Sequence, residues 1–216
     1  ELVSAGVIQF SDERWQLPRA LGDFPVPTSL SDALMKRLKQ ASGTAQAVID
    51  VLTVAGRCLD LDLIAACCEG SDSAVFAALD ELRDADLVSE SGDGYDLPPG
   101  LSRRRLLEEI SAARQAKLHG LLGRLLERRY GDQARSGAAQ LAVHFLRGGA
   151  KYKAIRYLDW ASSELYDAQA LMDARPLLEE LEGLLVAEGG EAARYGSALS
   201  SQLLLTRQRL ARVGVA

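Results

Sequence analysis

The sequence has few of the residues on which secreted proteins and metalloenzymes depend. Its three cysteines are Cys58, Cys67 and Cys68. This odd number, with two of them adjacent, gives neither a disulfide framework nor the C-x-x-C spacing of metal sites. The only histidines, His119 and His144, are too few for a three-histidine zinc site, and each stands among core-type residues. We therefore expect small buried roles for the thiols and structural, partly buried roles for the histidines.

Several functional signals are also absent. The sequence contains no G-x-x-x-x-G-K-[ST] phosphate loop and no G-x-S-x-G nucleophile elbow. Acidic clusters, such as Asp60 with Asp62 and the run Glu179–Glu182, are typical of helix caps and solvated faces. The chain opens without a signal peptide, and no apolar run approaches the roughly 18 residues that span a bilayer. We expect a cytoplasmic, non-enzymatic chain without cofactor or membrane contact, and the missing initiator Met suggests a piece of a longer protein.

What the sequence has is apolar content and an uneven charge. Apolar residues make up 48% of the chain and aromatics only 6%, which favours helices packed through leucine and alanine. Residues 1–100 carry 7 basic and 17 acidic side chains, residues 101–160 carry 13 and 5, and residues 161–216 carry 5 and 8. We expect the acidic N-terminal part to attract the basic middle, within one chain or between chains.

The apolar pattern divides the chain into four parts. Residues 1–28 are interpreted as the trailing segment of an absent domain and a linker, with a short strand at Trp15 and prolines that favour extended backbone. Residues 29–99 predict helices that start near Ser29, after Ser42, at Asp60 and near Ser71, followed by a strand–turn–strand over 87–97. Several helices closed by one hairpin describe a winged helix.

The remaining residues predict helices only. Residues 100–132 are interpreted as connecting helices, and residues 133–216 as repeats similar to tetratricopeptide (TPR) repeats, with helices over 138–147, 151–164, 166–172, 174–187 and 191–212. Pro176 fits the first turn of its helix. The predicted fold is thus mainly α, a winged-helix domain followed by a TPR-like solenoid. Tyr152, Tyr157 and Trp160 are spaced for packing within a helix pair, and some of them are candidates for lining a partner-binding groove.

The charge pattern of the sequence favours protein partners over nucleic acid. The helix of the winged-helix segment that would enter a DNA groove carries Asp72, Asp80, Glu81 and Asp84 against Arg83 alone, so DNA would repel it. The basic stretch Arg103, Arg104 and Arg105 lacks interleaved aromatics for nucleic-acid stacking, which favours a solvated face or a contact with the acidic domain.

The order of these segments resembles the part of STAND-class regulatory ATPases that follows the nucleotide-binding core. Relatives of that part occur in LuxR-type activators, in antibiotic-regulator-like transcription factors and beside adenylate cyclase or kinase domains. The resemblance covers roughly residues 15–186. The matching segments are Pro27–Asp32 (P-x-S-L-x-D), Arg37–Ser42 (R-L-x-x-L-S), Leu52–Ala65 (similar to A-A-V-L-G-R-x-F-D-L-D-L-L-A), Ala78–Val88 (A-L-D-E-L-x-x-A-x-L-V), Arg114–His119 (R-x-x-L-H) and Ala142–Tyr157 (A-x-H-[FY]-L-x-A-G-x-x-x-K-A-I-x-Y).

The resemblance implies a regulatory fragment whose winged helix packs against an upstream ATPase core, while its repeats bind a protein partner or a small-molecule inducer. In the family a histidine after the wing is thought to sense bound ADP. Here Pro99 stands at that position, and proline cannot donate a hydrogen bond to phosphate, so we expect this route to be lost. The alternatives are a winged-helix DNA-binding regulator with a helical dimerisation domain, and an enzyme with an unfamiliar active site. Self-association fits any of them.

Overall fold

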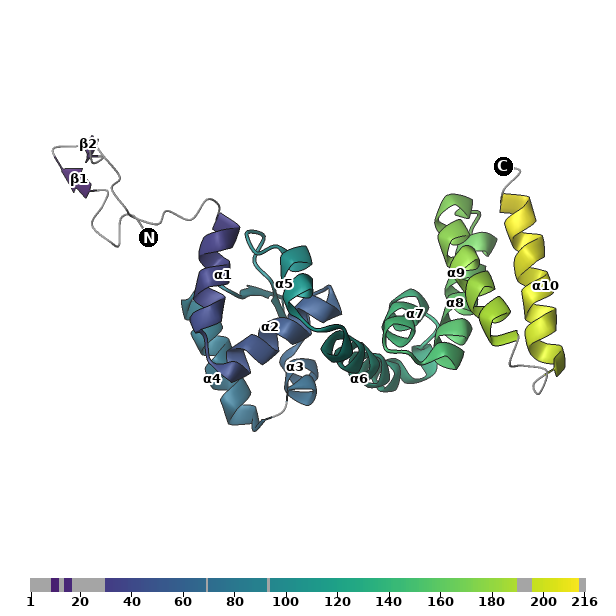
Figure 1. Cartoon of the computed structure of the whole chain (residues 1–216), viewed down its shortest axis with the longest axis horizontal. Helices are drawn as coiled ribbons and strands as arrows, with labels where there is room; N and C mark the ends of the chain where they lie inside the picture. Colours follow the sequence, from purple (N-terminus) through teal and green to yellow (C-terminus); the bar gives the residue numbers. More distant parts are fainter. Residues whose placement is uncertain are drawn as a thin grey trace.

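A computed structural model describes residues 9–11, 14–16, 30–68, 70–92, 94–189 and 196–213. It is mainly helical, with 77% helix, which confirms the predicted fold class at that level. Figure 1 shows two helical lobes joined through one long helix. Most of the segment 1–28, including its predicted linker, lies outside the described residues; within it, β1 (Gln9–Ser11) and β2 (Arg14–Gln16) pair antiparallel, with Phe10 opposite Trp15.

The first lobe contains helices α1 to α5 and a short hairpin. Its elements are α1 (Leu30–Gln40), α2 (Gly43–Ala55), α3 (Leu61–Cys67), α4 (Asp72–Asp84), β3 (Ser89–Ser91), β4 (Gly94–Asp96) and α5 (Arg103–Glu109). The predicted hairpin is confirmed, and Tyr95 on β4 forms an additional antiparallel bridge to Leu59. This bridge ties the segment between α2 and α3 to the hairpin.

Polar side chains cap these helices, at Asp60 and Ser71 as the sequence predicts and also at Ser42, where it predicts only a break. The Ser42, Asp60 and Ser71 side chains accept hydrogen bonds from the first-turn amides of α2, α3 and α4, and Gly56 ends α2 in the left-handed conformation. The Ser42 hydroxyl and amide also donate to the Glu81 carboxylate at 2.6 and 2.8 Å. Helix capping therefore also fixes α2 against α4.

The second lobe is a row of helices that pack in chain order. Its elements are α6 (Ala112–Tyr130), a 3₁₀ turn (Gly131–Gln133), α7 (Ala138–Arg147), α8 (Lys151–Asp167), α9 (Leu171–Gly189) and α10 (Gly196–Val213), each helix packing on the next. α6 also contacts α2 and α3 of the first lobe. One continuous apolar core extends from Leu34 in α1 to Leu185 in α9, and a small second cluster joins α9 to α10.

The prediction of two short helices over 166–172 and 174–187 was wrong. Helix α8 continues to Asp167, and α9 is a single helix with Pro176 inside it rather than in its first turn. The chain turns instead at Gln169, whose φ of 60° is left-handed, and the Ala170 amide donates back to the Leu165 carbonyl. An interior proline removes one backbone hydrogen bond and its ring crowds the carbonyl one turn earlier, yet α9 continues through Pro176 while packed on α8 and α10.

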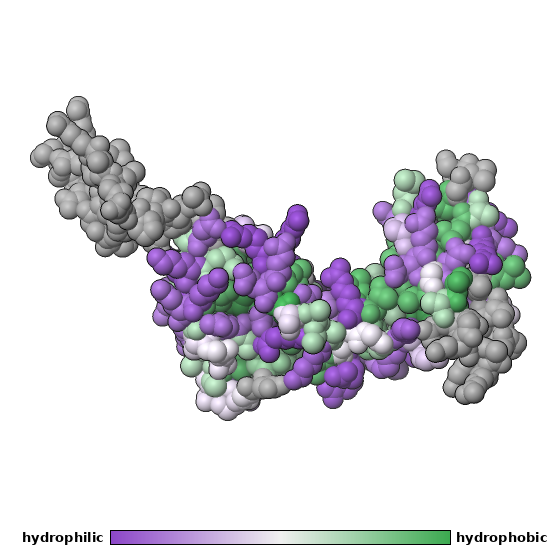
Figure 2. Space-filling model, in the orientation of Figure 1, coloured by the Kyte–Doolittle hydropathy of each residue, from purple (hydrophilic) through white to green (hydrophobic). Residues whose placement is uncertain are grey.

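The two lobes frame a broad hollow. In Figure 2 its walls show hydrophilic and hydrophobic residues side by side. Among the described residues, no helix combines the length and the apolar character that a bilayer crossing requires.

Candidate interaction surfaces

Polar side chains connect the two lobes where α6 and α7 meet the first lobe. Arg57, just after α2, donates to the Gln140 side-chain oxygen at 2.8 Å, and the Tyr130 hydroxyl donates to the same oxygen at 2.9 Å. Further along the same connection between α2 and α3, Asp60 forms an ion pair with Arg129 of α6. Burial alone would raise the pKa of Asp60, but hydrogen bonds from the Leu63 amide and from Arg129 outweigh it and lower the pKa. The lobes are thus held by directional contacts as well as by apolar packing.

Further ion pairs join the basic middle of the chain to the acidic residues 1–100. Arg105 approaches Asp32 at 2.6 Å, and Arg114 approaches Asp50 at 2.5 Å. The attraction expected from the charge distribution therefore acts within one chain. These side chains are partly exposed, so water and salt screen their attraction, and the main effect of the pairs is to fix orientation.

The three predicted basic partner-binding residues lie in different environments. Arg103 is half-buried and pairs with Asp96 of β4 at 2.9 Å, and Arg105 pairs with Asp32. Arg104 extends into solvent, with 90% of its side chain exposed, and contacts Glu108 one turn along α5. Of the three, only Arg104 presents its charge outward, while Arg103 and Arg105 contact carboxylates of the acidic residues 1–100, as the sequence favours.

The three predicted aromatic residues also differ in burial and contacts. Tyr157 is buried, stacks on Phe145 with 5.6 Å between ring centroids, and meets Trp160 edge-on at 5.4 Å. Trp160 is half-buried, with the Arg135 guanidinium 5.9 Å from its ring centroid. Tyr152 is 60% exposed. Packing is thus the role of Tyr157, and Tyr152 is the one of the three whose ring lies mostly on the surface.

Glu127 on α6 connects this helix to α8 through two side chains of α8. Its carboxylate accepts a hydrogen bond from the Tyr157 hydroxyl at 2.7 Å and forms an ion pair with Lys153. Burial and the bond to Glu127 raise the pKa of Tyr157 to about 12, so the phenol stays protonated as a donor. Burial would raise the pKa of Glu127 as well, but Lys153 and Tyr157 lower it, so the carboxylate stays charged. This arrangement fixes the stacking of α8 on α6.

His119 and His144 form a contact that sequence reasoning missed. Both rings are buried, 2% exposed each, and their Nδ1 atoms lie 3.0 Å apart between α6 and α7. One neutral ring must donate while the other accepts, since two protonated rings would repel. Burial, together with the nearby Arg147 guanidinium, lowers the pKa of His119 to about 4; burial, the neighbouring His119, Arg147 and Arg57 lower that of His144 to about 4. Their separation of 25 residues hid the pair, although each lies one helical turn from a core leucine, Leu122 or Leu141.

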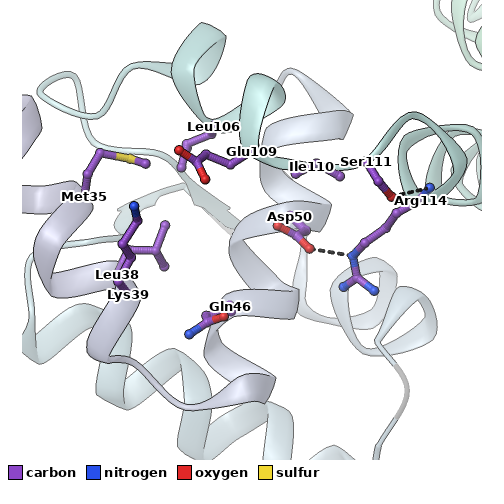
Figure 3. A pocket seen from close by; sticks show the side chains of 10 residues that line it. All are labelled: Met35, Leu38, Lys39, Gln46, Asp50, Leu106, Glu109, Ile110, Ser111 and Arg114. Carbon is purple, nitrogen blue, oxygen red and sulfur yellow. Dashed lines mark hydrogen bonds and ion pairs between the residues drawn. The ribbon is translucent and has the colours of Figure 1, made fainter.

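The first lobe contains a pocket of about 400 Å³ between α1, α2, α5 and α6. Figure 3 shows Met35, Leu38, Leu106 and Ile110 at its apolar base, and its rim carries Lys39, Gln46, Asp50, Glu109, Ser111 and Arg114. Asp50 and Arg114 pair with each other across one side. An apolar base with a charged rim suits an amphipathic group, and Asp50 and Arg114 neutralise each other on one side of that rim.

The sequence predicts that all three thiols are buried, and the structure buries one of them fully and two of them partly. Cys67 is buried, while Cys58 and Cys68 are half-buried, and all three are free. Burial raises the pKa of the Cys67 and Cys68 thiols to about 12 and about 11, so both remain protonated and unreactive at neutral pH. Within the described ranges, no group of three or more His, Cys, Asp or Glu side chains could hold a metal ion. Comparison with protein-family models, with curated proteins and with solved structures finds no match to this chain.

Proposed function

We propose that this chain is a non-catalytic regulatory and protein-interaction part of a larger cytoplasmic signal-transduction ATPase of the STAND class. Residues 29–99 would form a winged helix that packs against the ATPase core. Residues 133–216 would form TPR-like repeats that bind a protein partner or a small inducer, and binding would shift the balance between closed and open arrangements. Residues 100–132 would transmit that shift from one lobe to the other.

Local geometry supports the winged-helix part of this proposal. Helices α2, α3 and α4 precede the β3–β4 hairpin, and the Leu59–Tyr95 bridge adds a third extended segment to it. Pro99, at the position of the family's sensing histidine, lies exposed in the turn that the Leu101 amide closes onto the Pro98 carbonyl. We therefore propose that regulation in this chain does not use that residue to read nucleotide.

The packing order of the helices supports the proposed transmission from one lobe to the other. Each of α6 to α10 packs mainly on its neighbours in the chain, which is how helical repeats build an extended binding surface. The observation that carries the proposal is that α6 belongs to both lobes: it contacts α2 and α3 on one side and α7 on the other. A partner that displaced α7 or α8 would also displace α6, and α6 would transmit that displacement to α2 and α3 of the first lobe.

The proposal predicts what lies upstream in the gene. We expect the coding sequence before Glu1 to specify a G-x-x-x-x-G-K-[ST] loop, and the full-length protein to bind ADP with an affinity lost when the lysine of that loop is changed to alanine. Reading the coding region and measuring binding of a fluorescent ADP analogue checks both. A full-length protein without the loop, or one with unchanged binding in the alanine variant, would contradict the proposal.

The second candidate is a DNA-binding winged helix, and the charge on α4 weighs against it. Asp72, Asp80 and Asp84 are exposed on α4, and its only cation, Arg83, contacts Asp80 at 2.7 Å and also approaches Asp84 and Glu90. We expect no mobility shift of a random duplex at low salt with micromolar protein, because few phosphates could be neutralised. A variant with Asp80 and Asp84 changed to lysine serves as the control for charge. A shift by the unaltered chain that weakens as salt rises would favour the DNA regulator.

A further inference from the structure

The outer face of α3 and α4 carries an exposed aromatic ring beside a hollow. Phe76 is 51% exposed, although its neighbours Val75 and Leu79 on α4 are buried in the core. The hollow measures about 380 Å³ and is lined by Leu61, Asp62, Ala65, Ala66, Asp72 and Phe76. An apolar ring at the edge of a concave, partly apolar surface is the usual composition of a side-chain binding site.

The charge around this hollow has one sign. Its lining contains Asp62 and Asp72, both exposed, and no cation. Arg83, the only cation among the described residues of α3 and α4, is held by Asp80, with Asp84 and Glu90 close by, nearly two turns of helix beyond Phe76. A cationic group arriving at the rim would therefore meet two carboxylates that no basic group of the lining neutralises.

We propose that this surface, the Phe76 hollow, binds an apolar side chain flanked by lysine or arginine on a protein partner. The apolar side chain would enter between Leu61, Ala65 and the Phe76 ring, and the flanking cations would lie against Asp62 and Asp72. The complementarity of charge selects this occupant over an acidic or purely apolar one. The proposal rests only on the residues of this surface, which lies outside the repeats, so it stands whether or not the proposed function does.

A synthetic peptide tests the hollow directly. The probe is a short helical peptide in which one leucine is flanked by lysines and arginines, titrated into the isotope-labelled chain and followed by amide chemical shifts. We expect shifts confined to α3 and α4, an affinity that falls as salt rises, and binding at least about fivefold weaker with Phe76→Ser or with Asp62→Asn and Asp72→Asn together. Val186→Ser is the matched control, because Val186 is equally exposed at 51% but lies on α9.

Three results would overturn the proposal. The first is equal binding by the chain and by both sets of hollow variants, with their folding checked by circular dichroism. The second is equal binding of a peptide whose cations are replaced by glutamate. The third is a concentration-dependent dimer, seen by sedimentation, that Phe76→Ser abolishes, since a second copy of the chain would then be the occupant. Because the carboxylate variants alter exposed side chains only, they keep the test valid even if Phe76→Ser unfolds.

Discussion

Lowering the pH from 7 to 5 is expected to reduce the free energy of unfolding of this protein by about 4 kcal/mol, because of the buried His119–His144 pair. In the folded chain both histidines have a pKa of about 4, against 6.5 for an exposed histidine. Between these values the unfolded chain binds two protons that the folded chain excludes. The free energy of unfolding therefore has its full value, as far as this pair is concerned, above pH 6.5, and it decreases progressively as the pH falls from 6.5 towards 4.

Urea unfolding at a series of pH values measures this dependence. The pH range from 7 to 5 isolates the histidines, because the carboxyl groups whose pKa folding lowers, such as Asp60 and Glu127, have unfolded values of 3.8 and 4.5. The control is the double variant His119→Gln and His144→Gln, which keeps a polar pair without a titrating ring. We expect this variant to lose no more than about 1 kcal/mol over the same range. Equal pH dependence in both proteins would show that the pair does not control it.

Replacing Gly148 with alanine is expected to destabilise the protein by about 3 kcal/mol, which lowers the melting temperature by roughly 10 °C. A Cβ atom at Gly148 would lie 2.7 Å from the Cα and N atoms of Gly120 on α6. Both obstacles are backbone, so neither side chain movement nor a new rotamer relieves the overlap. The φ of Gly148 is −81°, which alanine adopts freely, so the whole effect is steric.

Gly120→Ala is the matched control for this crossing. The two glycines face each other, yet a Cβ at Gly120 would meet the Arg124 side chain at 3.6 Å and the Gly148 carbonyl oxygen and Cα at 3.7 and 4.0 Å, which are ordinary contacts. Since Gly120 is inside α6, alanine there gains up to about 1 kcal/mol of helix propensity. Thermal unfolding of both variants should thus give shifts of opposite sign. A Gly148→Ala variant as stable as the unaltered protein would mean that the two segments are not in backbone contact at this crossing.

The positions of most helices follow from local rules that the sequence contains. Ser42, Asp60 and Ser71 cap the helices that they precede, and Gly56 ends α2, because these effects involve only a few neighbouring residues. The helix over 138–147 and the start of the next at Lys151 were predicted correctly for the same reason, with glycines between them. The break near Gln169 was missed, because glutamine carries no signal for a left-handed backbone and Pro176 suggested a helix start that packing overrode.

The sequence by itself determined the composition of the core, the limits of most helices, and the opposite charges of the first hundred residues and the next sixty. Only the tertiary structure decided which charges and rings meet. It joined Arg105 to Asp32 and Arg129 to Asp60, buried Tyr157 while leaving Tyr152 exposed, and brought His119 to His144 across 25 residues of chain. The physical reason is range: capping and periodicity act within a turn or two of helix, whereas pairing of distant side chains depends on how whole helices cross.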